Sequence, residues 1–222
     1  GVVAIALGKA IWGGLGQNLF NPALVRRAFL QAAFPSALTT WTAPVERFFQ
    51  LPPTTLAPPF AKAAVDVATS ATPLGLAKFQ RETTELGRLL SGDIAGSLGE
   101  TAGIVLIACG LWLGFRRVFD WRLPLATLGA VALGSAAMHL ARPEQFQGPL
   151  FMLGSGGLLF GAVFMVTDPV TTPVTKRGSW IFGAGVGLLV VLIRLFGGLP
   201  EGVQYSILLM NGVTPLINRY TQ

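Results

Sequence analysis

Five apolar runs separated by short connections constrain the fold of this chain more than any other feature. They occupy residues 101–115, 123–140, 149–166, 179–196 and 203–217. Each approaches the roughly 20 residues that an α-helix needs to cross the hydrocarbon core of a bilayer. Charged residues make up only 12% of the 222, about half the share usual in a soluble domain. These features predict an all-α polytopic membrane protein, built as a helix bundle in a lipid bilayer.

A sixth apolar run, 19–34, carries two arginines and an early proline. Because an arginine facing lipid is costly, we expect a short or broken helix in which Arg26 and Arg27 face protein or water. Gly1 opens inside an apolar stretch without an initiator methionine, which indicates a chain that starts within a longer protein. The whole chain, 1–222, is therefore expected to form a single transmembrane domain.

The positions of lysine and arginine predict the orientation in the membrane. The connections 116–122 and 168–178 hold three and two of them, whereas 141–147 and 198–202 hold one and none. Cytoplasmic loops carry an excess of these residues. Counting through the spans places the C-terminus in the cytoplasm and makes 37–100 an extracytoplasmic loop segment. The net charge of +6 thus reflects basic loops at one membrane face, and no nucleic-acid partner is expected.

The loop segment 37–100 has two parts. Its first part is rich in proline and threonine and is expected to be irregular. Its second part has Leu76, Phe79, Leu86 and Leu89 at roughly helical spacing with polar residues between them, which predicts a helix lying along the membrane or on a partner.

The stretch "DVATSATPL", residues 66–74, raises the question of chemistry. Thr72 could cap a helix in a solvated loop, or it could be modified. A threonine hydroxyl is a poor nucleophile without a base or a metal, and no such partner lies nearby in sequence. A modification would therefore be made by another enzyme that reads the small residues Ser70 and Ala71. With one cysteine and one histidine, the chain cannot form a Cys/His metal site or an internal disulfide, and no metal site or catalytic residue is predicted.

Three further stretches place small and polar residues beside an apolar run: "GGLGQNLFNPALVRRAF" (13–29), "SGDIAGSLGETAG" (91–103) and "MVTDPVTTPVTKRG" (165–178). Asn18 and Asn21 lie one helical turn apart and could bind a ligand or bond to a neighbouring helix. Asp168, which precedes Pro169, could bind a ligand or form a turn.

The run Asp66, Thr69, Ser70, Ala71, Thr72 resembles a flavinylation motif, in which a flavin transferase joins FMN to the final threonine through a phosphoester. Ser70 stands where this motif usually has glycine. The stretches "GGLGQNLFNPA", "GSLGET", "DPVTTPVT" and "LLMNGVTPLINRYTQ" are similar to the NqrB subunit of the sodium-pumping NADH:quinone oxidoreductase and, more closely, to the RnfD subunit of the Rnf complex.

This resemblance implies a flavin-carrying subunit of the bacterial inner membrane in an Rnf-type complex, which couples electron transfer between ferredoxin and NAD to movement of Na+ or H+. It implies FMN on Thr72 at the periplasmic face, and riboflavin held noncovalently, for which Asn18, Asn21 and Asp168 are our candidates. It also implies a bundle similar to urea channels that lacks the N-terminal membrane helices of the full family. The implied partners are the other Rnf subunits and a flavin transferase, and the implied role is that of an electron carrier within an ion-translocating oxidoreductase.

Three other interpretations stay open at this point. The first is the NqrB subunit of the sodium-pumping NADH:quinone oxidoreductase. A solute channel or transporter would explain broken helices, and a scaffold without a cofactor would explain the bundle alone. Flavin absorbance in the purified protein, if measured, would argue against the last two.

Overall fold

All regular secondary structure in the described part of the chain is helical. The computed structural model describes residues 1–12, 14, 16, 18–39, 41, 71–97 and 99–222, and no strand occurs among them. The elements are α1 (Val2–Ala6), η1 (Ala10–Trp12), α2 (Pro22–Ala33), α3 (Pro35–Thr39), α4 (Pro73–Gly75), η3 (Leu76–Gln80), α5 (Leu86–Ser91), α6 (Gly103–Phe115), α7 (Arg122–Ala141), α8 (Pro149–Gly154), α9 (Leu158–Phe160), η4 (Gly161–Met165), α10 (Lys176–Phe196) and α11 (Val203–Thr221). This confirms the predicted helical class.

The two longest helices are also the clearest candidate membrane spans. Within the described residues, α7 and α10, of 20 and 21 residues, are the helices that are long and apolar enough to cross a bilayer, and α6 is apolar but shorter. Large apolar side chains on their outer faces are exposed, among them Leu133 on α7, Leu188 on α10 and Trp112 on α6. An apolar outer surface around a helical bundle is consistent with a membrane protein.

Close packing of α7 against α10 forms the centre of the bundle. A Cβ atom on Gly187 would lie 2.5 Å from the carbonyl oxygen of Thr127, and one on Gly183 would lie 2.7 Å from the Cβ of Ala126. Two glycines four residues apart therefore let the helix backbones touch, as small residues do between membrane helices. The buried apolar side chains around this contact are Leu123, Val131, Phe182, Val186, Val190 and Ile207.

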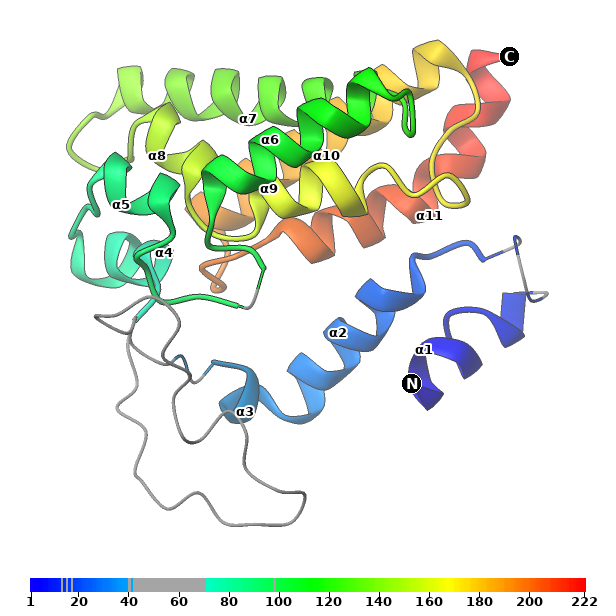
Figure 1. Ribbon diagram of the computed structural model, residues 1–222, viewed down its shortest axis with the longest axis horizontal. Coiled ribbons are helices and arrows are strands. Elements are labelled where there is room, and N and C mark those ends of the chain that lie inside the picture. Colours follow the sequence, from blue (N-terminus) through cyan, green and yellow to red (C-terminus); the bar gives the residue numbers. More distant parts are fainter. Residues whose placement is uncertain (13, 15, 17, 40, 42–70, 98) are drawn as a thin grey trace.

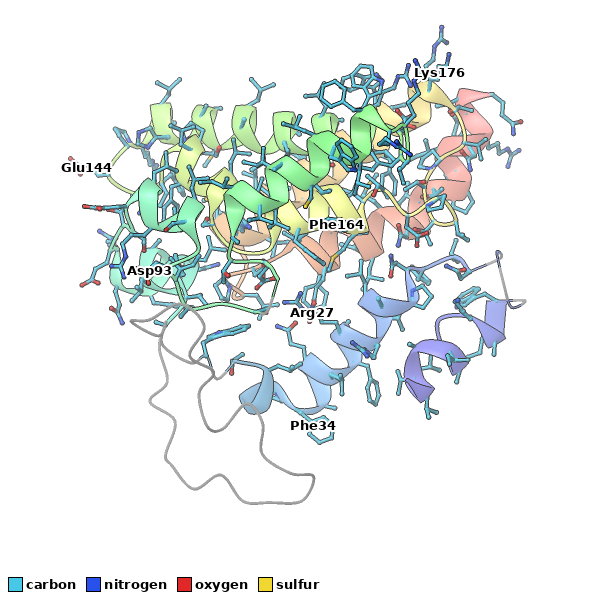
Figure 2. The ribbon with its side chains drawn as sticks, in the orientation of Figure 1. Arg27, Phe34, Asp93, Glu144, Phe164 and Lys176 are labelled. Carbon is cyan, nitrogen blue, oxygen red and sulfur yellow. The ribbon has the colours of Figure 1, made fainter. Side chains whose placement is uncertain are left out.

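The remaining helices pack around this pair (Figure 1). The C-terminal helix α11 lies against α10, α2 packs on α11, and α1 lies beside α2. The short helices α4 and α5 gather at one end of the bundle, with the 142–148 and 197–202 connections, and the other end holds the C-terminus and the start of α10. In Figure 2, Glu144 and Lys176 mark these two ends, and Arg27 extends from α2 toward the bundle.

Two predictions about the spans need comment. The run 19–34 forms the short helix α2, and Arg27 faces the protein as expected, where it meets two carboxylates. The expected continuous span over 149–166 is wrong, because the chain leaves the helix at 155–157 between α8 and α9. The sequence "GSGG" at 154–157 explains this, since Gly156 adopts φ +65°, which favours glycine.

The expected helix through Leu76 and Leu89 is also wrong as a single element. It consists of η3 and α5, which are separated by a non-helical segment at 81–85. Arg81 adopts a left-handed conformation, φ 59°, at the end of η3 and stops the helix there. The predicted irregular part of the loop segment falls mostly on 42–70, outside the described residues.

Candidate functional site

Thr72 sits at the start of α4, in a position set by local sequence. Its side-chain oxygen accepts a hydrogen bond from the backbone N–H of Gly75 at 3.2 Å, and Pro73 occupies the first helical position. Threonine as N-cap followed by proline is a favoured way to begin a helix. Pro73 and Leu74 are buried, whereas Thr72 itself stays partly exposed. The Thr72 hydroxyl is therefore held in position by a hydrogen bond but is not buried in the core.

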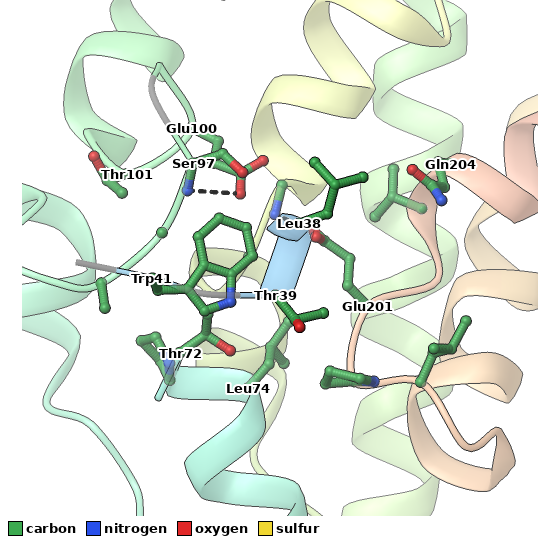
Figure 3. Close-up of a pocket in the computed structure, with 18 of the residues that line it drawn as sticks. Leu38, Thr39, Trp41, Thr72, Leu74, Ser97, Glu100, Thr101, Glu201 and Gln204 are labelled. Carbon is green, nitrogen blue, oxygen red and sulfur yellow. Dashed lines mark hydrogen bonds between the residues drawn. The ribbon is translucent and has the colours of Figure 1, made fainter. Parts of the chain in front are cut away.

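A cavity of about 260 Å³ opens beside Thr72. Its walls come from distant parts of the chain: α2, the 92–102 connection, the break between α8 and α9, and the start of α11. Figure 3 shows the indole of Trp41 among the lining side chains, between Thr72 and Glu100. The polar and aromatic residues that line the cavity are Arg27, Gln31, Thr39, Trp41, Thr72, Ser97, Glu100, Thr101, Glu201 and Gln204.

The break between α8 and α9 is stabilised by two charged side chains from elsewhere. Arg194, which is 4% exposed, donates to the carbonyl oxygens of Met152 at 2.6 Å and Ser155 at 3.0 Å. Glu201 accepts a hydrogen bond from the backbone N–H of Gly157. Helix ends leave backbone groups without partners, and these two residues supply them.

Two carboxylates converge on the break. A Cβ atom on Gly157 would lie 2.7 Å from Oε2 of Glu100 and 2.9 Å from Oε1 of Glu201. Arg27 lies 3.9 Å from Glu100 and 3.7 Å from Glu201, and Ser97 N–H donates to Glu100 at 3.2 Å. The side chain of Glu100 is only 9% exposed. Burial and the nearby Glu201 raise the pKa of Glu100, and Arg27 and the bonds to Ser97 oppose this rise in part.

Polar atoms without a partner gather around the same place. Within the described residues, the buried side-chain atoms without a hydrogen bond are Ser155 Oγ, Arg194 Nε, Gln204 Oε1 and Thr171 Oγ1, and the first three belong to the break or to the cavity wall. Gln204 donates through Nε2 to Gln31, which leaves its oxygen as a free acceptor. A buried acceptor without a donor is uncommon in folded proteins.

The sequence profile of the NQR2, RnfD, RnfE family matches residues 1–222. The chain belongs to this family. Among its curated relatives, the D subunit of the proton-translocating ferredoxin:NAD(+) oxidoreductase complex of Clostridium ljungdahlii is 42% identical over 230 residues, which cover 99% of this chain and 65% of that protein. The chain thus spans about two thirds of the length of this relative.

Two other relatives show the same pattern. The D subunit of the ion-translocating oxidoreductase complex of Stutzerimonas stutzeri is 41% identical, with 97% of this chain and 65% of that protein covered. The D subunit of the Na(+)-translocating ferredoxin:NAD(+) oxidoreductase complex of Acetobacterium woodii is 40% identical, with 100% and 63% covered. The predicted resemblance to the family, and to its RnfD members in particular, is confirmed.

The structure describes only part of the predicted attachment motif. Thr72 and Ala71 are described, and Thr72 lines the cavity. Asp66, Thr69 and Ser70 lie outside the described residues. Attachment of FMN to Thr72 therefore stays a prediction, and what the geometry adds is a partly exposed hydroxyl on a cavity that Trp41 and Arg27 also line.

Two of the predicted riboflavin residues, Asn18 and Asn21, lie just before the start of α2, whereas the cavity-lining Gln31 lies in its last turn. The third, Asp168, follows η4. Asn21 and Asp168 come together, because Asn21 Nδ2 donates to Asp168 Oδ2 at 3.1 Å, and Asn21 Oδ1 accepts from the first backbone N–H groups of α2. Asn18 donates to the carbonyl oxygen of Phe20. These contacts fit the helix-contact and turn interpretations of the sequence, while the flavin interpretation stays a prediction.

Several residues of the cavity and of the neighbouring break between α8 and α9 were not singled out from the sequence. Arg194, Glu201 and Gln204 lie in or beside apolar runs, where each resembles an ordinary polar residue at a helix end. The available signal was the glycine-rich interruption at 154–157, because a break in a membrane helix has to find partners for its backbone groups. Arg194, near the end of the run 179–196, is a residue that could supply hydrogen bonds to such backbone groups.

Proposed function

We propose that this chain is the flavin-carrying membrane subunit of an Rnf-type electron transport complex, with FMN joined through a phosphoester to Thr72. The observation that supports this most strongly is the combination of family membership with a partly exposed Thr72 hydroxyl at the edge of a cavity. The relatives from Clostridium ljungdahlii and Acetobacterium woodii are named as subunits of a proton-translocating and a Na(+)-translocating ferredoxin:NAD(+) oxidoreductase complex. By this proposal the chain serves as an electron carrier within such an oxidoreductase.

The residues around Thr72 fit such a group. Thr72 would supply only the ester oxygen, and this atom already accepts a hydrogen bond from Gly75, which fixes its position. Arg27 offers a guanidinium for a phosphate, and Trp41 offers an aromatic face for a flat ring. When bound, FMN supplies the electron-carrying isoalloxazine ring. The protein would set the position of this ring and the polarity of its surroundings.

Riboflavin near Asn18, Asn21 and Asp168 is a second part of the proposal. Asn21 and Asp168 bond to each other, and the carboxylate keeps further lone pairs for a hydroxyl donor. A neutral ribityl chain suits such acceptors, since no cation is needed to hold it. The expected result is a second flavin that denaturation releases, and that is lost in Asp168→Ala while the flavin on Thr72 remains. Release of an equal amount of flavin from Asp168→Ala would contradict this assignment.

The proposal also includes the placement of the chain. In the bacterial inner membrane, the end of the bundle with Thr72 would face the periplasm, and the end with Arg116, Arg117 and Lys176 would face the cytoplasm. A bundle similar to urea channels, the other Rnf subunits and a flavin transferase as partners belong to the same proposal. With Cys109 replaced by alanine, a membrane-impermeant maleimide should label Gln80→Cys but not Val118→Cys in intact cells. The reverse pattern would overturn the orientation.

The attachment site is tested by expressing the full-length protein with a flavin transferase. We expect one FMN on the peptide that contains Thr72, seen as fluorescence in a denaturing gel and as added mass. Thr72→Val should abolish both signals. Thr83→Val is the matched control, because Thr83 is a nearby exposed threonine outside the cavity, and it should keep both.

Two outcomes would contradict the assignment of FMN to Thr72. Fluorescence that persists in Thr72→Val would place the flavin elsewhere. An unmodified peptide in a fully active complex would favour the channel or scaffold alternatives, and solute flux through the isolated protein would then decide for the channel.

A further inference from the structure

The strongest group of residues outside the attachment chemistry is the carboxylate pair at the break between α8 and α9. Glu100 and Glu201 come from different connections, yet an oxygen of each lies within 3 Å of the same point, the Cβ position of Gly157. Two carboxylates this close repel each other when both are ionised. Such a pair relieves the repulsion by holding a proton.

The cations nearby do not remove this repulsion by direct hydrogen bonds to the pair. Arg27 from α2 approaches both carboxylates, but at 3.9 Å and 3.7 Å, longer than a hydrogen bond. Arg194 from α10 uses its two terminal nitrogens on the carbonyl oxygens of Met152 and Ser155. No other described residue that lines the cavity is charged. Of the two carboxylates, Glu100 is the more buried, at 9% against 26% side-chain exposure.

An independent feature of the cavity is a buried acceptor that requires a hydrogen-bond donor. Gln204 is 6% exposed and lines the cavity, and its Oε1 has no donor among the described residues. Figure 3 shows its side chain on the same cavity wall as Glu201. A lone acceptor needs an O–H or N–H donor, and a protonated carboxyl or the water that delivers its proton supplies one.

We propose that Glu100 and Glu201 form a proton-binding site, which takes up and releases one proton through the cavity beside Thr72. In the uptake step, hydronium in the cavity gives its proton to a carboxylate oxygen and leaves as water, and no electrons are transferred. Glu201 keeps its bond to Gly157 throughout, so Glu100 is the carboxyl that carries the proton for most of the time. The site does not depend on a flavin being attached.

The test uses dicyclohexylcarbodiimide, which modifies protonated carboxyl groups in apolar surroundings, on membranes that contain the full-length protein. Peptide mass spectrometry follows the adduct on Glu100 as a function of pH, with the exposed Glu144 as an internal control. We expect Glu100 to be labelled at pH values where Glu144 is not. Glu100→Gln should remove the adduct.

Two variants should shift the labelling midpoint in opposite directions. Glu201→Gln removes a like charge but keeps an oxygen for Gly157, so labelling of Glu100 should move to lower pH by about one unit, or about tenfold less adduct at a fixed pH above the midpoint. Arg27→Gln removes an opposite charge from a partly exposed position, so labelling should move to higher pH. The second variant tests the proposal even if the first fails to fold.

Three results would overturn the proposal: a pH profile for Glu100 that matches Glu144, a profile unchanged in both variants, or protection from labelling by Na+ but not by K+, which would indicate a metal-cation site instead. The same profile is expected in Thr72→Val. Loss of flavin attachment and loss of the proton site are therefore separate results.

Discussion

The two buried contact regions of this protein are held together by different physics. Between α7 and α10, Gly183 and Gly187 bring two helix backbones into contact, and apolar side chains fill the surroundings. At the break between α8 and α9, the chain leaves the helix, and Arg194 and Glu201 provide partners for the exposed backbone groups. The first region needs only small residues at the right spacing. The second needs charged residues from distant segments, which is why it can also bind a proton.

The largest effect is expected where a buried charge is removed. Arg194→Met should lower the free energy of unfolding by about 3 to 5 kcal/mol, because two carbonyl oxygens lose their donor and the neighbouring carboxylates lose a buried cation. Arg177→Met, at the exposed start of the same helix, should change it by less than about 0.5 kcal/mol. Unfolding in mild detergent, followed by tryptophan fluorescence, measures both. Equal effects would show that the break does not depend on Arg194.

The packed region should be more tolerant, since a helix contact can adjust slightly. Gly187→Val should cost about 1 to 3 kcal/mol, because the new Cβ meets Thr127 and Ala130 on α7 at 2.5 and 2.6 Å. Gly129→Ala on α7 is the control, since a Cβ there has no neighbour within 4 Å. It should be neutral or stabilising by up to about 1 kcal/mol. A neutral Gly187→Val would mean that the two helices do not pack this closely.

Lys78 provides an intermediate case, a charged cap on the end of α10 that is only partly buried. Its ammonium donates to the carbonyl oxygens of Arg194 and Leu199, each at 2.9 Å, and of Gly197. Lys78→Met should cost about 1 to 2 kcal/mol in the same assay, since part of the lost bonding is replaced by water. Lys176→Met, which is exposed at the other end of α10, should have almost no effect. If both substitutions cost the same, this cap contributes nothing specific.

The smallest effect is a dependence of stability on pH. Because the pKa of Glu100 is raised in the folded protein, the folded state binds more protons than the unfolded state between the ordinary glutamate pKa and the folded one. The free energy of unfolding should therefore fall as pH rises through this window, by at most about 1.4 kcal/mol per pH unit. Glu100→Gln should remove this slope and leave stability at low pH nearly unchanged. A rise in stability with pH in this window would contradict the raised pKa.

The same contrast explains what the sequence could and could not predict. Apolar runs at 123–140 and 179–196 anticipated α7 and α10 closely, because length and apolarity alone determine such helices. The break at 155–157 was missed because hydropathy counts glycine and serine as tolerable within an apolar run. Thr72 could be proposed as an attachment site because the motif that it resembles is contiguous, and that assignment stays a prediction. The pair of Glu100 and Glu201 could not, since neither residue indicates in sequence that the other lies beside it.

The three hydrogen bonds of Lys78 also limit how far the backbone at Thr72 can move. They attach η3 to the end of α10, and the backbone N–H of Leu76 bonds to the carbonyl oxygen of Thr72 at 2.9 Å. The proposed point of attachment is therefore held in a fixed position by these hydrogen bonds. A flavin esterified there would sweep a sphere whose radius is the length of its own ribityl phosphate arm. By the proposed function, any electron donor or acceptor would have to come within tunnelling distance of that sphere, so the position of Lys78 would limit where a partner can be placed.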